Sequence, residues 1–287
     1  MNNDAKIKKN VLLVYNSNND LSVRIYGDMR LWLERHNFSV ISMDPESCTN
    51  NGIAFEAEFA ISLGGDGTFL SCARSLSWNP VPILPVHLGT FGFITEFTHL
   101  EWKEALETWL DDRLYVENRV ALDVRIIRDN QELKSFRAIN DAVIGSSGIS
   151  KLVRLSLELG SYEAGNFRGD GMILSTATGS TAYSMASGGP ILVPPMNALV
   201  LTPICPFSFS WRPIVIPGRD RVAISVEANQ RSNVLLTIDG QESFPLEEGD
   251  LVRTSGRTAG VRVIKSNKRG FYEVIRTKLG WSGGPHA

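Results

Sequence analysis

The sequence predicts an α/β domain followed by a domain made almost entirely of β-strands. Two observations lead to this prediction. In roughly the first 120 residues, short apolar runs of strand length alternate with segments whose apolar residues recur at helical spacing. From Arg119 onward, apolar residues alternate at the strand period and helical signals nearly vanish. The first pattern is typical of a parallel sheet covered by helices, and the second is typical of antiparallel sheets.

The N-terminal half holds the expected strands and helices in alternation. Strands are expected at the apolar runs 11–15, 38–43, 59–63 and 81–88, the last of them interrupted by prolines. Helices are expected at 21–33, 68–76 and 102–110, where apolar residues return every three or four positions. Asp20 is the expected N-cap of the first helix, and Asn37 marks its end.

The C-terminal half reads as a series of short strands. A strand from Val120 is expected to turn at 129–132 into a partner strand that runs up to Ile144. Further strands are expected at 155–159, 172–175, 214–216, 222–226, 234–238 and 261–264. The segment 180–187 is the one clear helical candidate. Asp239-Gly240-Gln241, by itself, indicates a hairpin turn.

Composition narrows the class of protein. The chain has 287 residues, 43% of them hydrophobic and 21% charged, as in ordinary soluble globular proteins. The net charge of −2 does not predict a nucleic-acid partner, and no apolar run approaches the length of a membrane span. Cys48, Cys72 and Cys205 form no CxxC pair, so we expect a reduced, cytoplasmic protein without a structural zinc site.

A glycine-rich segment, Gly64-Gly65-Asp66-Gly67-Thr68, lies between the third expected strand and the next helix. Glycines let the backbone come close to a ligand. The N-terminus of the following helix presents free N–H groups to phosphate. The segment matches neither the Walker A nor the GxGxxG pattern. On its own it fits two interpretations equally well: a phosphate-binding loop made by Gly64, Gly65, Gly67 and Thr68, or a plain turn in which Asp66 caps the helix.

Other polar segments follow in the C-terminal half. Arg168 and Asp170 precede a short strand that leads into 176–184, where five serines and threonines surround one glycine. Such a run can bond to sugar hydroxyls and phosphates, or it can cap a helix, and its length favours contact with a ligand. Asn140-Asp141 either reads an adenine or ribose or closes a turn. The four scattered histidines do not support a Ser/His/Asp hydrolase.

Taken together, these segments resemble the NAD kinase family over Val11–Trp281, nearly the whole chain. The most specific part is Asp170–Pro190, with the sequence DGMILSTATGSTAYSMASGGP. Supporting stretches are 89–93 (GTFGF), Asn140-Asp141, 202–206 (TPICP), 212–215 (RPIV) and 273–278 (EVIRTK).

The resemblance implies an architecture and a reaction. The expected domains are an α/β domain with a Rossmann-like or phosphofructokinase-like parallel sheet (1–119), a β-sandwich-like NAD-binding domain (120–265) and a C-terminal segment that returns to the first domain (266–287). The implied reaction moves the γ-phosphoryl group of ATP to the 2′-hydroxyl of the adenosine ribose of NAD. A divalent cation such as Mg²⁺ is the implied cofactor, and a homodimer or homotetramer the implied assembly, with no nucleic-acid or membrane partner.

The resemblance also assigns roles by motif position. Asp66 is the proton acceptor, or alternatively a metal ligand, and Gly67 is its neighbour on the substrate. Phe93, Asn140 and Asp141 line the adenine and nicotinamide pockets. Contacts with the second half of the dinucleotide are assigned to Lys151, Arg168 and Asp170. Along the ribose and base of that half lie Thr181, Ala182, Tyr183, Ser184, Met185 and Ala186. Gln241 approaches from the far side.

Several positions depart from the usual pattern of the family. His87 stands where the family generally has Asn, and Asp141 replaces the commoner Glu; both changes bear on the fit of the substrate. Ala177 replaces Pro. Phe207 and Trp211 replace more polar residues, which bears on packing or on subunit contact.

The sequence leaves two other functions open. A lipid kinase of the diacylglycerol or sphingosine type also carries a Gly-Gly-Asp-Gly loop, although the hydroxyl-rich run 176–184 is not expected there and no amphipathic basic face stands out. A non-catalytic NAD-binding sensor is the other alternative. Whether ATP or polyphosphate is the donor, whether NAD or NADH is preferred, and how NADP(H) regulates the protein are also open.

Overall fold

The computed structural model describes residues 9–48, 56–76, 78, 81–89, 92–148, 152–230 and 232–281. The chain divides into two compact units. Unit 1 takes the residues up to Glu117 and those from Arg262 onward, and unit 2 takes Asn118–Val261. Residues 262–264 therefore fall in unit 1, where they pair with a strand of its sheet, although the sequence analysis placed them in the β-rich domain.

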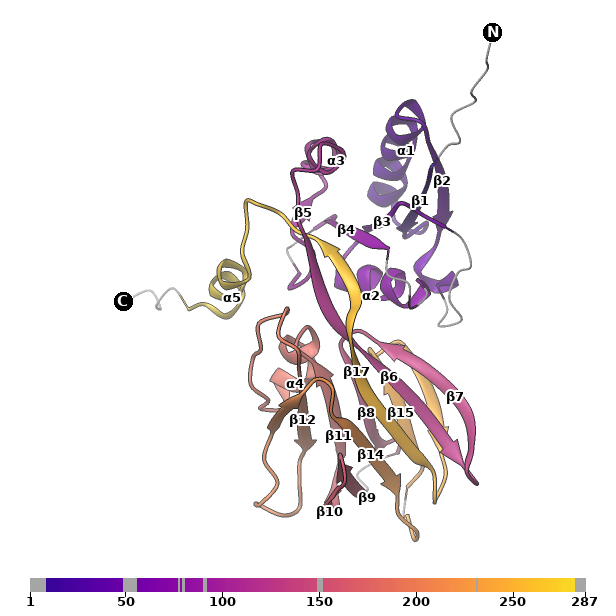
Figure 1. Ribbon diagram of the computed structural model, residues 1–287, viewed down its shortest axis with the longest axis vertical. Helices are drawn as coiled ribbons and strands as arrows, with labels where there is room; N and C mark the ends of the chain where they lie inside the picture. Colours follow the sequence, from indigo (N-terminus) through magenta and orange to yellow (C-terminus); the bar gives the residue numbers. More distant parts are fainter. Residues whose placement is uncertain are drawn as a thin grey trace. The chain divides into compact units, whose positions relative to one another are not determined.

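Unit 1 is built on a parallel sheet, as predicted from the alternating pattern (Figure 1). Its strands are β1 (Lys9–Tyr15), β2 (Phe38–Met43), β3 (Phe59–Leu63) and β4 (Pro82–His87), in the order β2-β1-β3-β4. The short β5 (Phe97–Thr98) and the end of β17 (Leu251–Ile264) both pair with β4. The helices of this unit are α1 (Asp20–Arg35), α2 (Asp66–Ser75), α3 (Trp102–Leu110) and α5 (Phe271–Leu279), with a short 3₁₀ turn at Pro45–Ser47.

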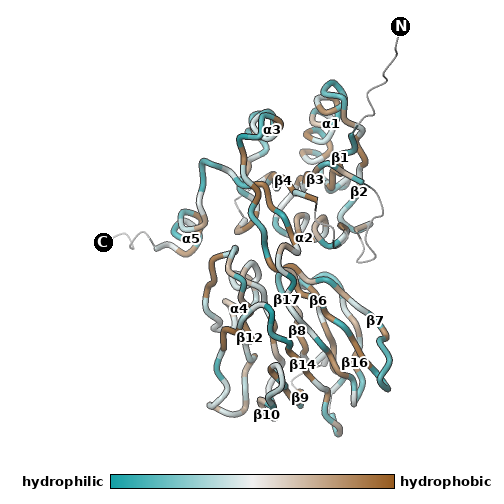
Figure 2. Tube along the Cα trace, viewed as in Figure 1, coloured by the Kyte–Doolittle hydropathy of each residue, from teal (hydrophilic) through white to brown (hydrophobic). Residues whose placement is uncertain are grey.

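The core of unit 1 forms because its central strands are apolar on both faces. Every residue of β3 and β4 is buried, and hydrophobic residues gather along these strands in Figure 2. The apolar stripe of α1, with Met29 and Leu33, packs into the same cluster. At the start of α1 the N-cap is Asn19, whose side chain accepts from the Ser22 N–H at 2.9 Å, so the predicted cap at Asp20 was wrong by one residue. Asn37 adopts φ 64°, the left-handed conformation that ends a helix.

Unit 2 consists of two packed sheets, which confirms the β-sandwich-like prediction. One sheet has the order β10-β9-β14-β17-β6-β7 and the other β13-β12-β11-β8-β15-β16. The strands of the first sheet besides β17 are β6 (Val116–Arg128), β7 (Gln131–Ala138), β9 (Val153–Leu159), β10 (Tyr162–Gly169) and β14 (Arg221–Val226). Those of the second are β8 (Asp141–Ser146), β11 (Gly171–Thr176), β12 (Ala198–Ile204), β13 (Ile214–Pro217), β15 (Val234–Ile238) and β16 (Glu242–Leu246). All neighbours in the second sheet pair antiparallel.

The hydrophobic core of unit 2 lies between its two sheets. Leu122 and Leu157 come from one sheet and Leu174 and Leu236 from the other, and all are almost fully buried in one cluster. Strand alternation produces this arrangement, because every second side chain of each strand faces inward. In the described residues no helix is long and apolar enough to cross a membrane.

Two details of unit 2 differ from the sequence prediction, and both affect the candidate site. The strand expected to continue to Ile144 is broken at 139–140, where the chain passes from β7 in one sheet to β8 in the other. The helix expected at 180–187 is a 3₁₀ turn at Gly179–Thr181 followed by the single-turn helix α4 (Tyr183–Ala186).

Candidate functional site

The glycine-rich segment of unit 1 connects the end of β3 to the start of α2. The Gly64 N–H donates to the carbonyl of Val86 at 2.9 Å, which ties the segment to the neighbouring strand β4. A side chain at Gly64 would overlap that of Thr68, so the turn has room only for glycine there. Gly65 is the N-cap of α2 and Asp66 is its first residue, two residues earlier than the predicted helix start.

Asp66 is held by a second segment, residues 92–95, that follows β4. Its Oδ2 accepts from the Phe93 N–H at 2.8 Å. Its Oδ1 accepts from the N–H groups of Ile94 and Thr95 at 3.3 and 3.2 Å, and from Thr95 Oγ1 at 3.2 Å. A Cβ at Gly92 would overlap the carboxylate, so the loop approaches this closely because position 92 is glycine. The Asp66 carboxylate is thus held by a loop distant in the sequence, whereas no side-chain hydrogen bond caps α2.

The two oxygens of Asp66 differ in what they can still accept. A carboxylate offers about four acceptor positions, two on each oxygen. Among the described residues, three donors surround Oδ1, whereas Oδ2 has one bond, from Phe93. Oδ2 is thus the atom with capacity for one further hydrogen or cation.

Phe93, which the sequence analysis assigned to substrate binding, sits in the same group. Its ring is half-buried, and the Lys278 ammonium of α5 lies 5.6 Å from the ring centroid. A cation at this distance is attracted by the face of an aromatic ring. The structure therefore brings Gly64, Gly65, Asp66, Gly67, Thr68 and Phe93 together within unit 1 and adds Lys278, which the sequence analysis did not single out.

In unit 2, the break between β7 and β8 is fixed by the carboxylate of Asp239. Its oxygens accept from the N–H groups of Ile139 at 3.0 and 3.1 Å, of Asn140 at 2.7 Å and of Asp141 at 3.1 Å. Asp239 itself lies in the β15–β16 turn with φ 49°, as the hairpin signal predicted. That signal did not reveal the second role, because the bonded N–H groups lie about a hundred residues away in the sequence.

Asp141 is a buried acid beside this turn. Only 4% of its surface is exposed. Burial, and then the neighbouring charge of Asp239, raise the pKa of Asp141 to about 7. Next to it, Asn140 Oδ1 is buried and has no hydrogen-bond partner in the described part of the chain. The pair thus places one unsatisfied acceptor and one carboxyl group that titrates near neutrality side by side.

The hydroxyl-rich run that follows β11 is used largely for internal bonding. Thr176 Oγ1 donates to the Ile139 carbonyl at 2.6 Å, and Ser180 Oγ donates to the Ala177 carbonyl at 2.7 Å. Thr181 Oγ1 donates to the Thr178 carbonyl at 3.2 Å, and Ser184 Oγ bonds Thr202 Oγ1 at 2.8 Å. Among the five serines and threonines, Thr178 has a buried Oγ1 with no partner in the described residues. In the sequence, the length of the run favoured contact with a ligand; in the structure four of its hydroxyls bond within the protein.

The turn is tied to Asn140 by close backbone contact. The Thr176 N–H donates to the Asn140 carbonyl at 2.8 Å, and a Cβ at Gly179 would overlap the Asn140 backbone. Asn140, Asp141, the 179–186 segment and the Asp239–Gln241 turn therefore meet at one end of the second sheet, since β8, β11 and β15 are neighbours there. Within 179–186, Tyr183 and Ala186 are exposed, Ala182 and Met185 are half-buried, and Thr181 and Ser184 are buried.

Two other predicted site residues lie at the opposite end of β11. Asp170 directly precedes the strand, and Arg168 lies near the end of β10; both are exposed. Along the strand, this end is about 17 Å from Thr176 at 3.3 Å per residue. Asp170 neighbours Cys205, and that carboxylate raises the pKa of the thiol. Lys151 lies outside the described residues.

The described residues contain no group of three or more His, Cys, Asp or Glu side chains placed to hold a metal ion. Asp66 and Asp239 instead bond backbone N–H groups of distant loops.

Comparison with known proteins places both units in one family. Residues 11–114 match the family description "ATP-NAD kinase N-terminal domain", and residues 139–266 match "ATP-NAD kinase C-terminal domain". The chain is 43% identical over 226 residues to the NAD kinase of Treponema denticola, covering 79% of this chain and 80% of that protein. In fold it is similar to yeast NADH kinase complexed with NADH (TM-score 0.85, 23% identity, 98% of this chain and 89% of that one). It is also similar in fold to an NAD kinase from Archaeoglobus fulgidus in complex with ATP (TM-score 0.71, 24% identity, 96% and 100%).

Proposed function

Because this chain belongs to the ATP-NAD kinase family, we propose that it transfers the γ-phosphoryl group of ATP to the 2′-hydroxyl of the adenosine ribose of NAD. The observation that carries the proposal is the Asp66 carboxylate. It stands at the start of a helix after a glycine turn and is fixed by four donors from residues 93–95. One oxygen keeps capacity for a further proton or cation.

Asp66 acts in this proposal as the general base. As the 2′-hydroxyl oxygen attacks the γ-phosphorus, the bond from that phosphorus to the β,γ-bridging oxygen breaks and ADP leaves. Oδ2 takes the hydroxyl proton, since it is the less occupied oxygen. A positioned general base contributes about 10²–10⁴-fold to a rate. The remainder comes from orientation and charge neutralisation, which dominate phosphoryl transfer. The loop 92–95 serves orientation, because its N–H groups fix the carboxylate.

NAD recognition is assigned to Asn140, Asp141 and their neighbours in unit 2, and Gly67 and Phe93 are assigned to substrate contact beside Asp66. The unsatisfied Asn140 Oδ1 suits a donor group such as the adenine amino group. Asp141, neutral below about pH 7, can itself donate a hydrogen bond. We assign the exposed Tyr183 to the rest of the dinucleotide, which Gln241 approaches from the far side.

A divalent cation such as Mg²⁺ fits this chain only if the phosphates of ATP supply most of its ligands. Mg²⁺ is usually bound by one or two carboxylates together with substrate phosphates. The described residues offer no three-residue cluster, and Asp66 is the carboxylate nearest to the proposed chemistry. When bound, the ion would neutralise charge on the phosphates, and Asp66 Oδ2 is the protein oxygen that would reach it if it did not act as base.

The deciding experiment is to incubate the full chain with Mg-ATP and NAD and to look for NADP. In Asp66→Asn we expect turnover to fall by about 10²–10⁴-fold while circular dichroism and NAD binding stay close to wild type. Asp28→Asn, at an exposed position of α1, is the matched control and should keep full activity. A near-normal rate for Asp66→Asn would sink the assignment. A parallel incubation with diacylglycerol should give no phosphorylated product. NAD binding without any NADP product would indicate a sensor.

The proposal includes a homo-oligomer, dimer or tetramer. The first support is the distance of about 17 Å that separates Asp170 and Arg168 from the Asn140 end of the same sheet, which suits residues that serve a second copy. The second is an apolar surface after β12: Phe207 is 74% and Phe209 89% exposed, and Ile214 of the edge strand β13 is 45% exposed. Exposed apolar patches commonly mark protein interfaces.

Subunit complementation tests this assembly. If two copies share each site, a co-expressed mixture of Asp66→Asn and Asp170→Ala subunits regains activity that neither variant has alone. Light scattering of the wild type should give the mass of a dimer or tetramer, and Phe207→Ser should shift it toward the monomer. A mixture as inactive as its components would refute the shared site.

The three free thiols are typical of a reducing compartment, which supports a cytoplasmic location.

A further inference from the structure

Unit 1 contains a pocket of about 580 Å³ at the carboxyl end of β4. One side is formed by β4 and β5, with His87 and Thr98, and the other by α5. Carbon atoms make up most of its wall, including Val274 and the aliphatic parts of its longer side chains. Its volume is within the range of small-molecule sites, about 300–1,000 Å³.

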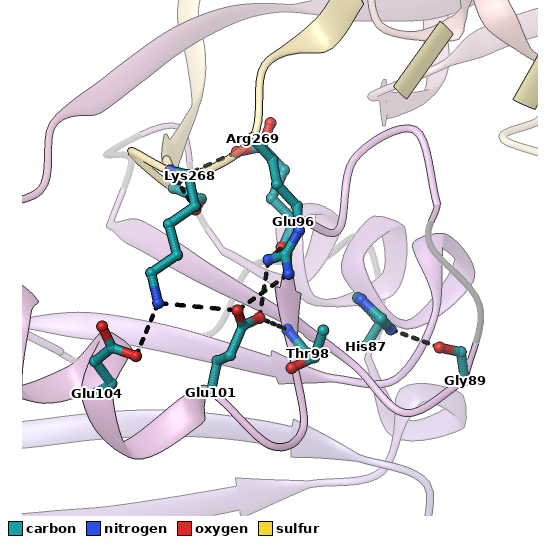
Figure 3. Close-up of polar contacts among 9 residues, drawn as sticks. His87, Gly89, Glu96, Thr98, Glu101, Glu104, Lys268 and Arg269 are labelled. Atoms are coloured by element: carbon teal, nitrogen blue, oxygen red, sulfur yellow. Dashed lines mark hydrogen bonds and ion pairs between the residues drawn. The ribbon is translucent and has the colours of Figure 1, made fainter. Parts of the chain in front are cut away.

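His87 presents a hydrogen-bond acceptor rather than a charge. The ring is only 3% exposed, and its Nδ1 lies 2.8 Å from the Gly89 carbonyl (Figure 3). A carbonyl can only accept, so Nδ1 carries the proton and Nε2 is the acceptor of the neutral ring. Burial lowers the pKa of His87, which keeps the ring neutral near pH 7. Such an atom suits a hydroxyl or amino group of a ligand and repels a phosphate oxygen.

The two cationic side chains of the pocket, Arg269 and Lys278, differ in whether they are paired with a carboxylate. Arg269 donates to both oxygens of Glu101, at 3.0 and 2.8 Å, and to the Glu96 carbonyl at 2.9 Å (Figure 3). Lys278 has no carboxylate partner among the described residues, and its ammonium lies 5.6 Å from the Phe93 ring centroid. Since the Phe93 N–H bonds Asp66, Lys278 stands next to the loop that holds the proposed base. Glu273 adds a negative charge to the same wall.

This distribution of charge suits a short anionic chain attached to a ring system. Inorganic polyphosphate carries a charge on every phosphate and has no apolar part, so it would need a row of uncommitted cations. A nucleoside triphosphate needs an apolar recess with a hydrogen-bond acceptor for the nucleoside and a cation for the phosphates.

On the premise of the phosphoryl transfer proposed above, we propose that this pocket binds the nucleoside of a nucleoside triphosphate donor, with His87 accepting from it and Lys278 holding its phosphate chain beside Phe93, so that inorganic polyphosphate is a poor donor. The choice of donor thereby follows from residues of this chain.

Arg269 and Glu101 are positioning residues for this pocket. Glu101 also accepts from the Thr98 N–H at 3.0 Å, and Arg269 holds its pKa at about 2, so the carboxylate stays ionised at any working pH. A further pair joins Lys268 to Glu104 at 2.8 Å (Figure 3). Together these bonds fix the start of α5 against β5 and α3, and with it the wall that carries Lys278.

Binding measurements test the proposal without depending on turnover. Calorimetry with a non-hydrolysable ATP analogue and with tripolyphosphate should show the analogue binding the full-length protein about tenfold or more tightly. Lys278→Gln should weaken the analogue by about tenfold, the order expected for one charged hydrogen bond. Lys103→Gln, at an exposed position of α3, is the matched control and should bind as wild type does. His87→Leu should weaken the analogue and leave tripolyphosphate unchanged.

Kinetics separate this proposal from the proposed function. In the NADP assay, Lys278→Gln should raise KM for ATP and leave KM for NAD unchanged, and Arg269→Ala should do the same more weakly, with rescue by Arg269→Lys. Equal binding of the analogue and tripolyphosphate, or an effect of Lys278→Gln on NAD alone, overturns the donor pocket. Absence of NADP in the wild type would overturn the kinase function, and the calorimetry would still decide the pocket.

Discussion

The buried carboxyl group of Asp141 should make the stability of this protein fall as pH rises through the acidic range. In the unfolded chain its pKa is close to the ordinary 3.8, whereas in the folded chain it is about 7. Between these values the folded state binds a proton that the unfolded state lacks. Stability is therefore fully present below about pH 4, declines toward pH 7 and is level above it.

The size of the effect follows from the same two values. A rise from 3.8 to about 7 corresponds to about 4 kcal/mol when each pKa unit is worth about 1.4 kcal/mol. Relaxation around the ionised group and entry of water reduce this, so we expect about 2–4 kcal/mol. Asp141→Asn removes the titrating group at nearly constant size. The free energy of unfolding of the variant minus that of wild type should therefore be larger at pH 8 than at pH 4, by about that amount.

Urea unfolding of both proteins at pH 4, 6 and 8, followed by far-ultraviolet circular dichroism, measures this difference. Comparing the two proteins at each pH cancels contributions from other groups. One of these is His87, whose lowered pKa acts in the opposite direction because the unfolded state then binds the extra proton. A stability difference between variant and wild type that is the same at all three pH values would refute the reasoning.

Two further predictions concern unit 1. Gly92→Ala places a Cβ where the Asp66 carboxylate lies, so kcat should fall by about tenfold or more with little change in Tm; an unchanged kcat would mean that this carboxylate needs no fixed position. Lys265→Met leaves Glu96, which is 2% exposed, without its buried cation. It should lower the free energy of unfolding in urea by about 3–5 kcal/mol, and adding Glu96→Gln should restore part of the loss, an outcome that purely steric damage would not give.

Local patterns were sufficient to predict β1 to β4 and α1 to α3 of unit 1, but they did not predict the short β5 or the helix α5. The apolar runs gave β1 to β4, because a central parallel strand is buried on both faces and therefore reads as continuous apolar sequence. The turn after β3 was recognisable from its glycines, and Gly64 does lie against Thr68 with no room for a side chain. Each of these features depends on residues close together in the sequence.

Features that depend on distant residues were not predictable. The pair between Lys265 and Glu96 joins positions 169 residues apart, and in the sequence both look like ordinary surface charges. The passage from β7 to β8 was read as one continuous strand, although Asn140-Asp141 allowed a turn, because the carboxylate that fixes the break comes from Asp239. For the hydroxyl-rich run, two of the bonding partners lie far away in the sequence, namely the Ile139 carbonyl and the Thr202 hydroxyl. Ser180 and Thr181 donate to carbonyls only three residues earlier.

The sequence contains Asp-Gly pairs at Asp66, Asp170 and Asp239, and the same dipeptide has a different role at each position. Each pair marks a strand boundary: Asp66-Gly67 opens α2 after β3, Asp170-Gly171 leads into β11, and Asp239-Gly240 forms the turn between β15 and β16. The role of each aspartate depends on which donors the fold brings to it. Asp66 receives the N–H groups of 93–95 and keeps one oxygen partly open. Asp239 accepts hydrogen bonds from the N–H groups of 139–141 and thereby has a structural role, whereas Asp170 lies at the surface. Of the three, Asp66 is therefore the one that combines a fixed position with remaining acceptor capacity, which is what a general base requires.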